Sequence, residues 1–174
     1  MLNSMDVLGK VLSALEGKRP EPARALLNLL LPQVIPFNRP LGLKIRRLTP
    51  AHSEVEIPFR RSNKNHLGGL HACALTTVGE YAAGLLILKR IDPSRQRLVL
   101  KNLNVEFLKQ GRAAAIAQVE WPESAPRGIE ELRGSAETQE IKLQTIVFAK
   151  DGSVELARVN TEWQIKPWSQ VRTK

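Results

Sequence analysis

The sequence has little of what builds disulfides, metal sites or aromatic recognition surfaces. Its 174 residues include one cysteine, Cys73, so no disulfide can form within the chain, which is typical of a reducing compartment. The three histidines and the cysteine show no zinc-ligand spacing. Aromatic residues make up only 5% and no basic run exceeds two residues, which argues against nucleic-acid binding. We therefore expect no metal, no redox cofactor and no nucleic-acid partner.

The chain also lacks an uninterrupted apolar run of membrane-spanning length. Its N-terminus carries Asp6 early and shows no basic segment followed by a long apolar core, so we expect no signal peptide. The most apolar stretch, residues 65–88, contains Glu80, Thr76 and Thr77, whereas a membrane span needs about 20 predominantly apolar residues. These absences predict a soluble, cytoplasmic protein without a membrane partner.

Positive charge is in excess. The formal net charge is +9 and the isoelectric point is about 10.1. Such a balance favours anionic partners, such as an acidic carrier protein, a phosphate-bearing ligand or nucleic acid, although simple solubility is the other interpretation. The length suggests a single domain, 1–174, with a sizeable core.

Helical signals dominate the first part of the chain. Apolar residues recur at helical spacing between residues 7 and 15. A second helix is predicted with Pro22 at its first position, and it should end before Pro32. We interpret residues 1–37 as a helical N-terminal extension and residues 38–166 as the core.

Strand signals follow, because apolar and polar residues alternate in six segments. Strands are expected at residues 41–46, 54–59, 98–109, 113–121, 133–149 and 157–165. The segment 122–128 is predicted to be a loop that could move. The stretch 65–88 lies between the second and third strands and is apolar on too many sides to be an ordinary surface helix. We predict an α+β protein in which a curved antiparallel sheet of about six strands wraps a long central helix.

The central stretch holds a single acid, Glu80. No lysine or arginine lies three or four residues away, so it does not form the usual surface ion pair of a helix. The residues on its stripe are small, namely Cys73, Thr76, Thr77 and Gly84. A buried acid with such space beside it tends to have a raised pKa and to act as a base or nucleophile. The other interpretation, equally open on the residues alone, is that this stripe faces solvent.

The start of the predicted helix is a second candidate site. His71 lies nine residues before Glu80, a separation of about half a turn beyond whole turns and about 13 Å of rise. The two side chains of one chain therefore cannot share a site, and two chains must contribute if both serve one. The preceding loop with Gly68 and Gly69 brings free N–H groups that could hold an oxyanion, although a tight turn and a capping histidine are the simpler interpretation. Cys73 has no activating histidine nearby and is more typical of a small buried residue.

The spacing of Asn65, Gly68, His71 and an acid at position 80 resembles a known motif. Hotdog-fold acyl-CoA thioesterases of the phenylacetate and 4-hydroxybenzoyl type have N-x-x-G-x-x-H-G-G, with Asp or Glu nine residues after the histidine. The segments 102–112 and 151–165 are similar to their strand and turn after the helix and to their final hairpin. The resemblance covers the predicted core, and an uncharacterised thioesterase-like subgroup is most similar.

The resemblance implies a homodimer that hydrolyses acyl-CoA or acyl-carrier-protein thioesters, with coenzyme A as part of the substrate; pairing of dimers into tetramers is the alternative. Glu80 of the partner subunit would be the general base or nucleophile, and Asn65 would position the water or the thioester. The Ala72 N–H would help to form the oxyanion hole, and His71 would orient the loop. Substrate would be bound by Arg61, Lys64, Gly68, Gly69, Thr76 and Thr77. Coenzyme A phosphates or an acidic carrier would suit the basic residues around the helix, which are Arg60, Arg61, Lys64, Lys89, Arg90, Arg95, Arg97 and Lys101, although a solvated basic face is the simpler interpretation.

Two departures from the motif leave alternatives open. Ala72 and Cys73 replace the two glycines after the histidine, which narrows the predicted pocket, and Glu80 replaces the aspartate of many members. A non-catalytic acyl-binding module is therefore the main alternative. A basic nucleic-acid-binding protein is a weaker one, and the motif of hotdog dehydratases is not seen.

Overall fold

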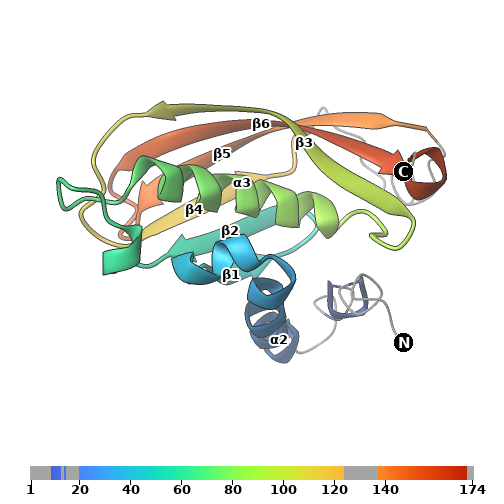
Figure 1. Cartoon of the computed structure of the whole chain (residues 1–174), viewed down its shortest axis with the longest axis horizontal. Helices are drawn as coiled ribbons and strands as arrows, with labels where there is room; N and C mark the ends of the chain where they lie inside the picture. The colour runs from blue at the N-terminus through green and yellow to red at the C-terminus, as the bar shows by residue number, and fades with distance from the viewer. Residues whose placement is uncertain (1–8, 13, 15–19, 124–136, 172–174) are drawn as a thin grey trace.

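Six antiparallel strands form one sheet, which is the framework of the fold (Figure 1). The computed structural model describes residues 9–12, 14, 20–123 and 137–171. In chain order the strands are β1 (Lys44–Leu48), β2 (His52–Ile57), β3 (Gln96–Phe107), β4 (Ala115–Glu120), β5 (Gln139–Ala149) and β6 (Glu155–Pro167). Their order across the sheet is β1-β2-β4-β5-β6-β3, so β1 and β3 are its edges. The predicted α+β class with a six-stranded antiparallel sheet is confirmed.

Alternation of apolar and polar side chains places one face of the sheet in the core. On β4, Ala115, Ala117 and Val119 are buried, while the residues between them are more exposed. The register pairs Ala117 with Val55 on β2 and with Val147 on β5, and both of these are buried too. Neighbouring strands therefore contribute buried residues at the same level, which together form a continuous apolar wall.

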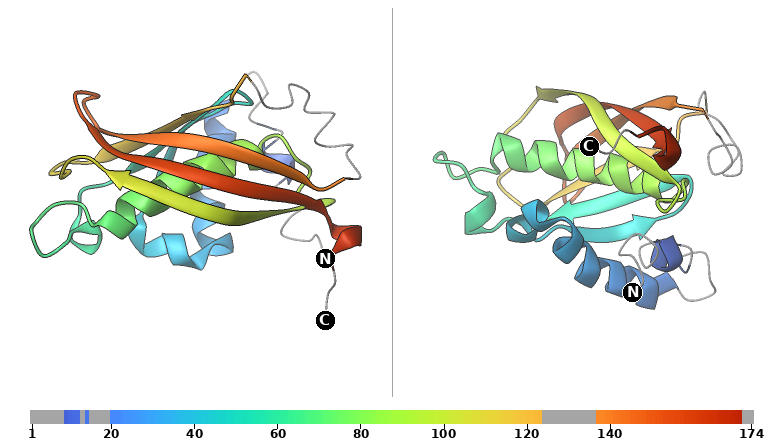
Figure 2. Two further views of the ribbon diagram at one scale, coloured as in Figure 1. Left: turned by 90° about the horizontal axis from the view of Figure 1, so that it is seen from above. Right: turned by 45° about the vertical axis from the view of Figure 1, so that its right-hand side comes forward.

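The long helix α3 (Ala72–Leu88) lies along this wall, and the sheet curves around it (Figure 1, Figure 2). A Cβ added at Gly79 would lie 2.5 Å from Val159 Cγ2 on β6, so the helix approaches the strands closely at this glycine. The Gly79 carbonyl also accepts a 3.1 Å hydrogen bond from the Thr145 hydroxyl on β5. Neither α3 nor any other described helix is long and apolar enough to cross a membrane.

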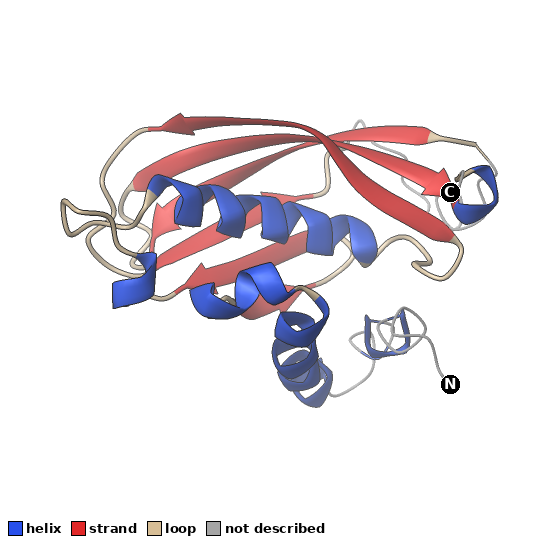
Figure 3. Cartoon of the chain, in the orientation of Figure 1, coloured by secondary structure: helices blue, strands red, loops and turns tan. Residues whose placement is uncertain are grey.

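Helix α2 (Pro20–Val34) packs beside the edge strand β1 (Figure 3). The Asn28 amide donates to the Ile45 carbonyl at 3.2 Å and accepts from the Ile45 N–H at 2.8 Å. The prediction that this helix ends before Pro32 is wrong. Leu31 is buried in the core and its carbonyl still accepts a 2.8 Å backbone hydrogen bond, so packing holds the last turn although Pro32 offers no N–H.

The first strand begins three residues later than predicted. A short 3₁₀ helix, η1 (Pro36–Leu41), occupies the expected start, and it ends at Gly42 with φ 62°. This left-handed conformation is one that glycine adopts readily and other residues do not. The chain becomes extended only after Gly42, and η1 contributes Phe37 and Asn38 to the wall of the site described next.

Some expectations fall on residues outside those described. The helix expected between residues 7 and 15 is helical at its described positions. The loop expected at 122–128, with its expected mobility, lies outside the described residues from position 124 onward. The same holds for residues 133–136 of the strand expected from residue 133. Residues 137 and 138 are described and lie outside the strand, so β5 begins later than predicted, at Gln139.

Candidate active site

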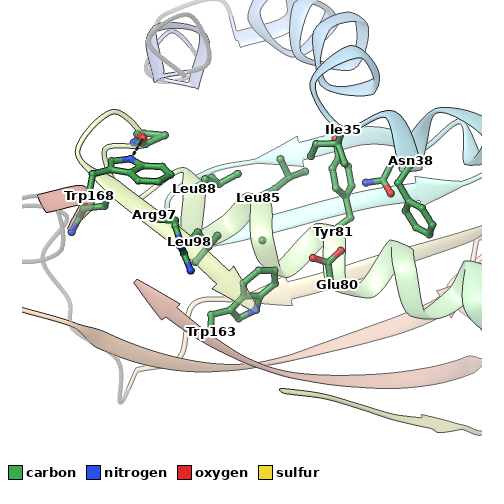
Figure 4. Close-up of a pocket in the computed structure, with 14 residues that line it drawn as sticks. Ile35, Asn38, Glu80, Tyr81, Leu85, Leu88, Arg97, Leu98, Trp163 and Trp168 are labelled. Atoms are coloured by element: carbon green, nitrogen blue, oxygen red, sulfur yellow. Dashed lines mark hydrogen bonds between the residues drawn. The ribbon is translucent and has the colours of Figure 1, made fainter. Parts of the chain in front are cut away.

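Glu80 projects from the middle of α3 into a cavity of about 550 Å³ (Figure 4). The cavity is bounded by α3, η1, the first residues of β3 and the end of β6. Most of its wall is apolar or aromatic, formed by Ile35, Phe37, Tyr81, Leu85, Leu88, Pro93, Leu98, Trp163 and Trp168. A volume of this size is typical of small-molecule sites, which usually combine apolar walls with a few polar groups.

Burial raises the pKa of Glu80 from 4.5 to about 7. No hydrogen bond or ion pair to the Glu80 carboxyl occurs among the described residues, so no positive group offsets the cost of burying its charge. The carboxyl can therefore take up or release a proton near neutral pH, which suits a general base. In the part of the chain that is described, no group of three histidine, cysteine, aspartate or glutamate side chains could hold a metal ion.

The exposure of the small residues on the stripe that includes Glu80 changes along α3. At its N-terminal end Cys73 is exposed, so the expectation that it is a buried small residue is wrong. One turn beyond Glu80, Gly84 is buried and lines the cavity. A Cβ added there would lie 3.2 Å from the Trp163 ring, so this glycine keeps the cavity open beside the acid. The stripe is thus exposed at one end and lines a pocket at the other.

Half of the aromatic residues of the chain line this cavity, namely Phe37, Tyr81, Trp163 and Trp168. They were not predicted from the sequence because they come from η1, α3 and the C-terminal segment, which are distant in the chain. Asn38 on η1 was missed as well. It is buried, and its side-chain amide lies beside the cavity without a hydrogen bond to any described residue. The only sequence signal for it is its position between Pro36 and Pro40.

The N-terminus of α3 offers one free backbone donor. His71 caps the helix, because its Nδ1 accepts the Cys73 N–H at 3.1 Å and its carbonyl accepts the Ala74 and Leu75 N–H groups. The Ala72 N–H, in contrast, has no partner among the described residues. An amide at a helix N-terminus carries partial positive charge and can stabilise an oxyanion.

The loop before α3 is held together by Asn65. Its Oδ1 accepts the Leu67 N–H at 3.0 Å and the Gly69 N–H at 3.1 Å, while its Nδ2 donates to the Leu70 carbonyl at 3.4 Å. Gly68 has φ 76°, which suits glycine. The loop projects beyond the end of the sheet in both views (Figure 1, Figure 2). Asn65 therefore shapes this loop, and its role toward substrate stays a prediction.

The hydroxyls of Thr76 and Thr77 are used within the helix. They donate to the Ala72 and Cys73 carbonyls at 3.0 and 2.7 Å, which leaves their oxygens as acceptors only. Before the loop, Arg61 is exposed on the short helix η2 (Arg61–Asn63).

Lys64 is also exposed, and its Nζ lies 4.0 Å from the centre of the Phe59 ring. Arg61 and Lys64 both remain candidates for binding a substrate anion.

Two basic residues after the helix have structural roles, which corrects their assignment as phosphate ligands. Lys89 is buried and its Nζ donates to the Leu12 carbonyl at 2.5 Å. Arg90 is buried as well, with Nε donating to the Pro50 carbonyl at 2.6 Å and its guanidinium 4.0 Å above the Trp121 ring. Neither is available to a substrate on the surface.

Residues 23–165 match the model of a protein family described as a domain of unknown function, DUF4442. The chain belongs to this family. No curated protein matches the chain.

The DUF4442 chain is also similar to solved structures. A Pseudomonas aeruginosa protein of unknown function, PA5026, described as a probable thioesterase, is 23% identical with a TM-score of 0.69, over 82% of this chain and 95% of that one. The Staphylococcus aureus thioesterase SAV0944 is 14% identical with a TM-score of 0.64, over 75% and 98% of the two chains. The Pseudomonas aeruginosa thioesterase PA1618 is 14% identical with a TM-score of 0.66, over 81% and 94%. The resemblance to hotdog thioesterases is confirmed at the level of the fold.

This DUF4442 protein has an exposed apolar edge. Strand β3 is an edge strand, and its Leu103 and Phe107 pair with Thr161 and Ala157, whose side chains face the core. Leu103 and Phe107 thus lie on the same face of the sheet as α3, yet they are 39% and 49% exposed. An edge strand with exposed apolar residues offers both free backbone groups and apolar surface to another chain.

Proposed function

We propose that the protein hydrolyses acyl thioesters of coenzyme A or of an acyl carrier protein, at a site that two subunits share. The observation that carries this proposal is Glu80, an acid with a pKa of about 7 and no ion-pair partner among the described residues, placed in an apolar cavity. Such a carboxyl is partly deprotonated at neutral pH, so it can act as a base while the apolar walls receive an acyl group.

Hydrolysis of a thioester needs a base, a water molecule and a hydrogen-bond donor to the oxyanion. The Glu80 carboxylate accepts a proton from a water molecule as the water oxygen attacks the thioester carbonyl carbon. The carbonyl oxygen becomes an oxyanion, and the Ala72 N–H of the partner subunit donates to it. When the C–S bond breaks, the Glu80 carboxyl returns its proton to the leaving sulfur, which gives a thiol and a carboxylic acid.

Two features support a site made by two subunits. Within one protomer His71 and Glu80 are nine residues apart on α3, which separates them by about 13 Å along the helix and points them to opposite sides. A second copy paired along β3 would cover Leu103 and Phe107 and would bring its own projecting loop to this side of the molecule. A symmetric dimer would then contain two equivalent sites.

The spacing of two mutated residues in a structural neighbour supports a site that combines a loop amide with a mid-helix acid. SAV0944 has been crystallised with a glutamine and, separately, with a glutamate changed to alanine, and these positions are 15 residues apart. Asn65 and Glu80 have the same separation. An amide in the loop before the helix and an acid at mid-helix would thus belong to one kind of site.

A non-catalytic acyl-binding module is the second candidate, and the contacts of Asn65 favour it. The Asn65 amide oxygen accepts two N–H groups of the loop and its Nδ2 donates to the Leu70 carbonyl, which leaves no free lone pair and one N–H for a substrate. If binding without hydrolysis is the function, the cavity would hold an acyl group while Glu80 stays protonated.

A thiol-release assay separates the two candidates. The wild-type protein would be given acyl-CoA and acyl-carrier-protein thioesters of increasing chain length, with release of the thiol followed by a thiol-reactive dye. We expect catalytic turnover that varies with the acyl group. Saturable binding of the same thioesters without any release of thiol would refute hydrolysis and would support the binding module.

A further inference from the structure

One cation reaches the acyl cavity, and nothing in the proposed reaction uses it. Arg97 lies near the start of β3 and lines the cavity, with its side chain between Leu98 and Trp168 (Figure 4). It makes no hydrogen bond and no ion pair with its side chain among the described residues. We propose that the cavity takes an acyl group that ends in a carboxylate and that Arg97 binds this carboxylate. This inference rests on the proposed function.

The neighbouring cations are used differently. Arg95 has its Nε 3.6 Å from the Asp92 carboxylate and is 78% exposed at its side chain. Lys101 pairs with Glu140. Lys89 and Arg90 are buried against backbone carbonyls. Arg97 is therefore the basic residue of residues 89–101 that lines the cavity and whose side chain has no partner among the described residues.

The surroundings of Arg97 favour an anion. Among the described residues, the only other ionisable side chains on the cavity wall are Glu80 and Tyr81. Burial and the adjacent Glu80 raise the pKa of Tyr81, which keeps the phenol neutral. Charges attract more strongly beside apolar walls than in water, and the planar guanidinium binds a carboxylate through two parallel hydrogen bonds.

The direction of the cavity also suits an acyl group that ends in a carboxylate. Glu80 lies toward η1, whereas Arg97 lies with Trp168 and Leu88 at the other end (Figure 4). Glu80 and Leu88 are eight residues apart on α3, a rise of about 12 Å. A thioester held at Glu80 would thus extend an acyl chain of medium length along α3, past Gly84, and place its far end at Arg97.

A matched pair of substrates tests the proposal. Suberyl-CoA and octanoyl-CoA have the same chain length and differ by one terminal carboxylate. We expect the wild-type protein to prefer suberyl-CoA. Arg97→Met should lower kcat/KM for suberyl-CoA by about 10- to 100-fold, as for a lost hydrogen bond to a charged group, and leave octanoyl-CoA nearly unchanged, while Arg97→Lys should retain part of the preference. Lys142→Met, which removes a cation that pairs with Glu162 and does not line the cavity, should change neither.

Two outcomes would overturn the proposal. The first is an equal effect of Arg97→Met on both substrates. The second is an effect of Arg97→Met that disappears when suberyl and octanoyl thioesters of pantetheine replace those of coenzyme A, because pantetheine carries no phosphate and Arg97 would then bind the coenzyme.

A binding measurement separates this inference from the proposed function. Calorimetric titration with monomethyl suberate and with methyl octanoate, which differ by one terminal carboxylate, needs no turnover. Tighter binding of monomethyl suberate that Arg97→Met abolishes would support the carboxylate site even if no thioester were hydrolysed. Hydrolysis without any preference for monomethyl suberate or suberyl-CoA would refute this inference alone.

Discussion

Replacing Glu80 by glutamine is expected to lower kcat/KM for the best thioester substrate by about 10²- to 10⁴-fold, the usual contribution of a general base. Glutamine has nearly the same shape and can still accept a hydrogen bond, but it cannot take a proton from water. The cavity beside Gly84 and Trp163 should keep its size, so KM should change much less than kcat. Thiol release measured over a range of substrate concentrations separates the two.

The control for this variant is another acid of the same chain. Glu120→Gln changes a carboxylate on β4 that is 86% exposed, and it should leave turnover unchanged.

Unfolding should not explain the loss of activity in Glu80→Gln. Because the folded protein raises the pKa of Glu80 from 4.5 to about 7, it binds a proton between these values that the unfolded chain does not. Stability therefore falls as pH rises through this window and levels off above it. The glutamine variant should be at least as stable as wild type at pH 8, and turnover close to wild type would refute the role of Glu80.

The pH dependence of the wild-type protein gives the second large effect. Glu80 must be deprotonated to act as a base, and its pKa is raised to about 7 because burial disfavours the charged form. Below this value kcat/KM should fall by about tenfold for each pH unit, and above it the rate should level off. An ordinary carboxylate would give a profile that is flat down to about pH 4.5.

The profile is measured as kcat/KM from pH 5 to 9 with saturating and limiting thioester. The acid limb should be absent from the residual activity of Glu80→Gln. A limb centred near pH 4.5, or one that remains in the glutamine variant, would assign the titrating group elsewhere.

The sequence pattern predicted the parts of this protein that depend on local order. Alternation on segments such as Ala115 to Val119 predicted the strands, because side-chain period two places every second residue in the core. The spacing of Asn65, His71 and Glu80 indicated two candidate halves of a site, and their roles toward substrate stay predictions. These features are local, since each is encoded within one element or within a loop and the element that follows.

The rest depends on contacts between distant parts of the chain. Lys89 donates to a carbonyl 77 residues away at Leu12, and no local pattern distinguishes this buried lysine from an exposed one at a helix end. The cavity brings Asn38, Arg97 and Trp163 together from three separate elements. Pro32 shows the same limit, because burial of a leucine overrode the local tendency of proline to end a helix.

Mixed dimers test the central claim most directly, since a shared site needs Glu80 from one subunit and the Ala72 N–H from the other. Ala72→Pro removes only that N–H, and proline is tolerated at the first position of a helix. The Glu80→Gln homodimer and the Ala72→Pro homodimer should each be nearly inactive. For Ala72→Pro we expect kcat to fall by about 10²- to 10³-fold, as for a lost oxyanion donor.

The two variants would be coexpressed with different affinity tags and the mixed dimer purified through both. Thiol release by this mixed dimer is the decisive measurement. A shared site predicts about half of the wild-type activity, because one of the two symmetric sites then contains both intact groups. A mixed dimer as inactive as its parents would contradict a site made by two subunits.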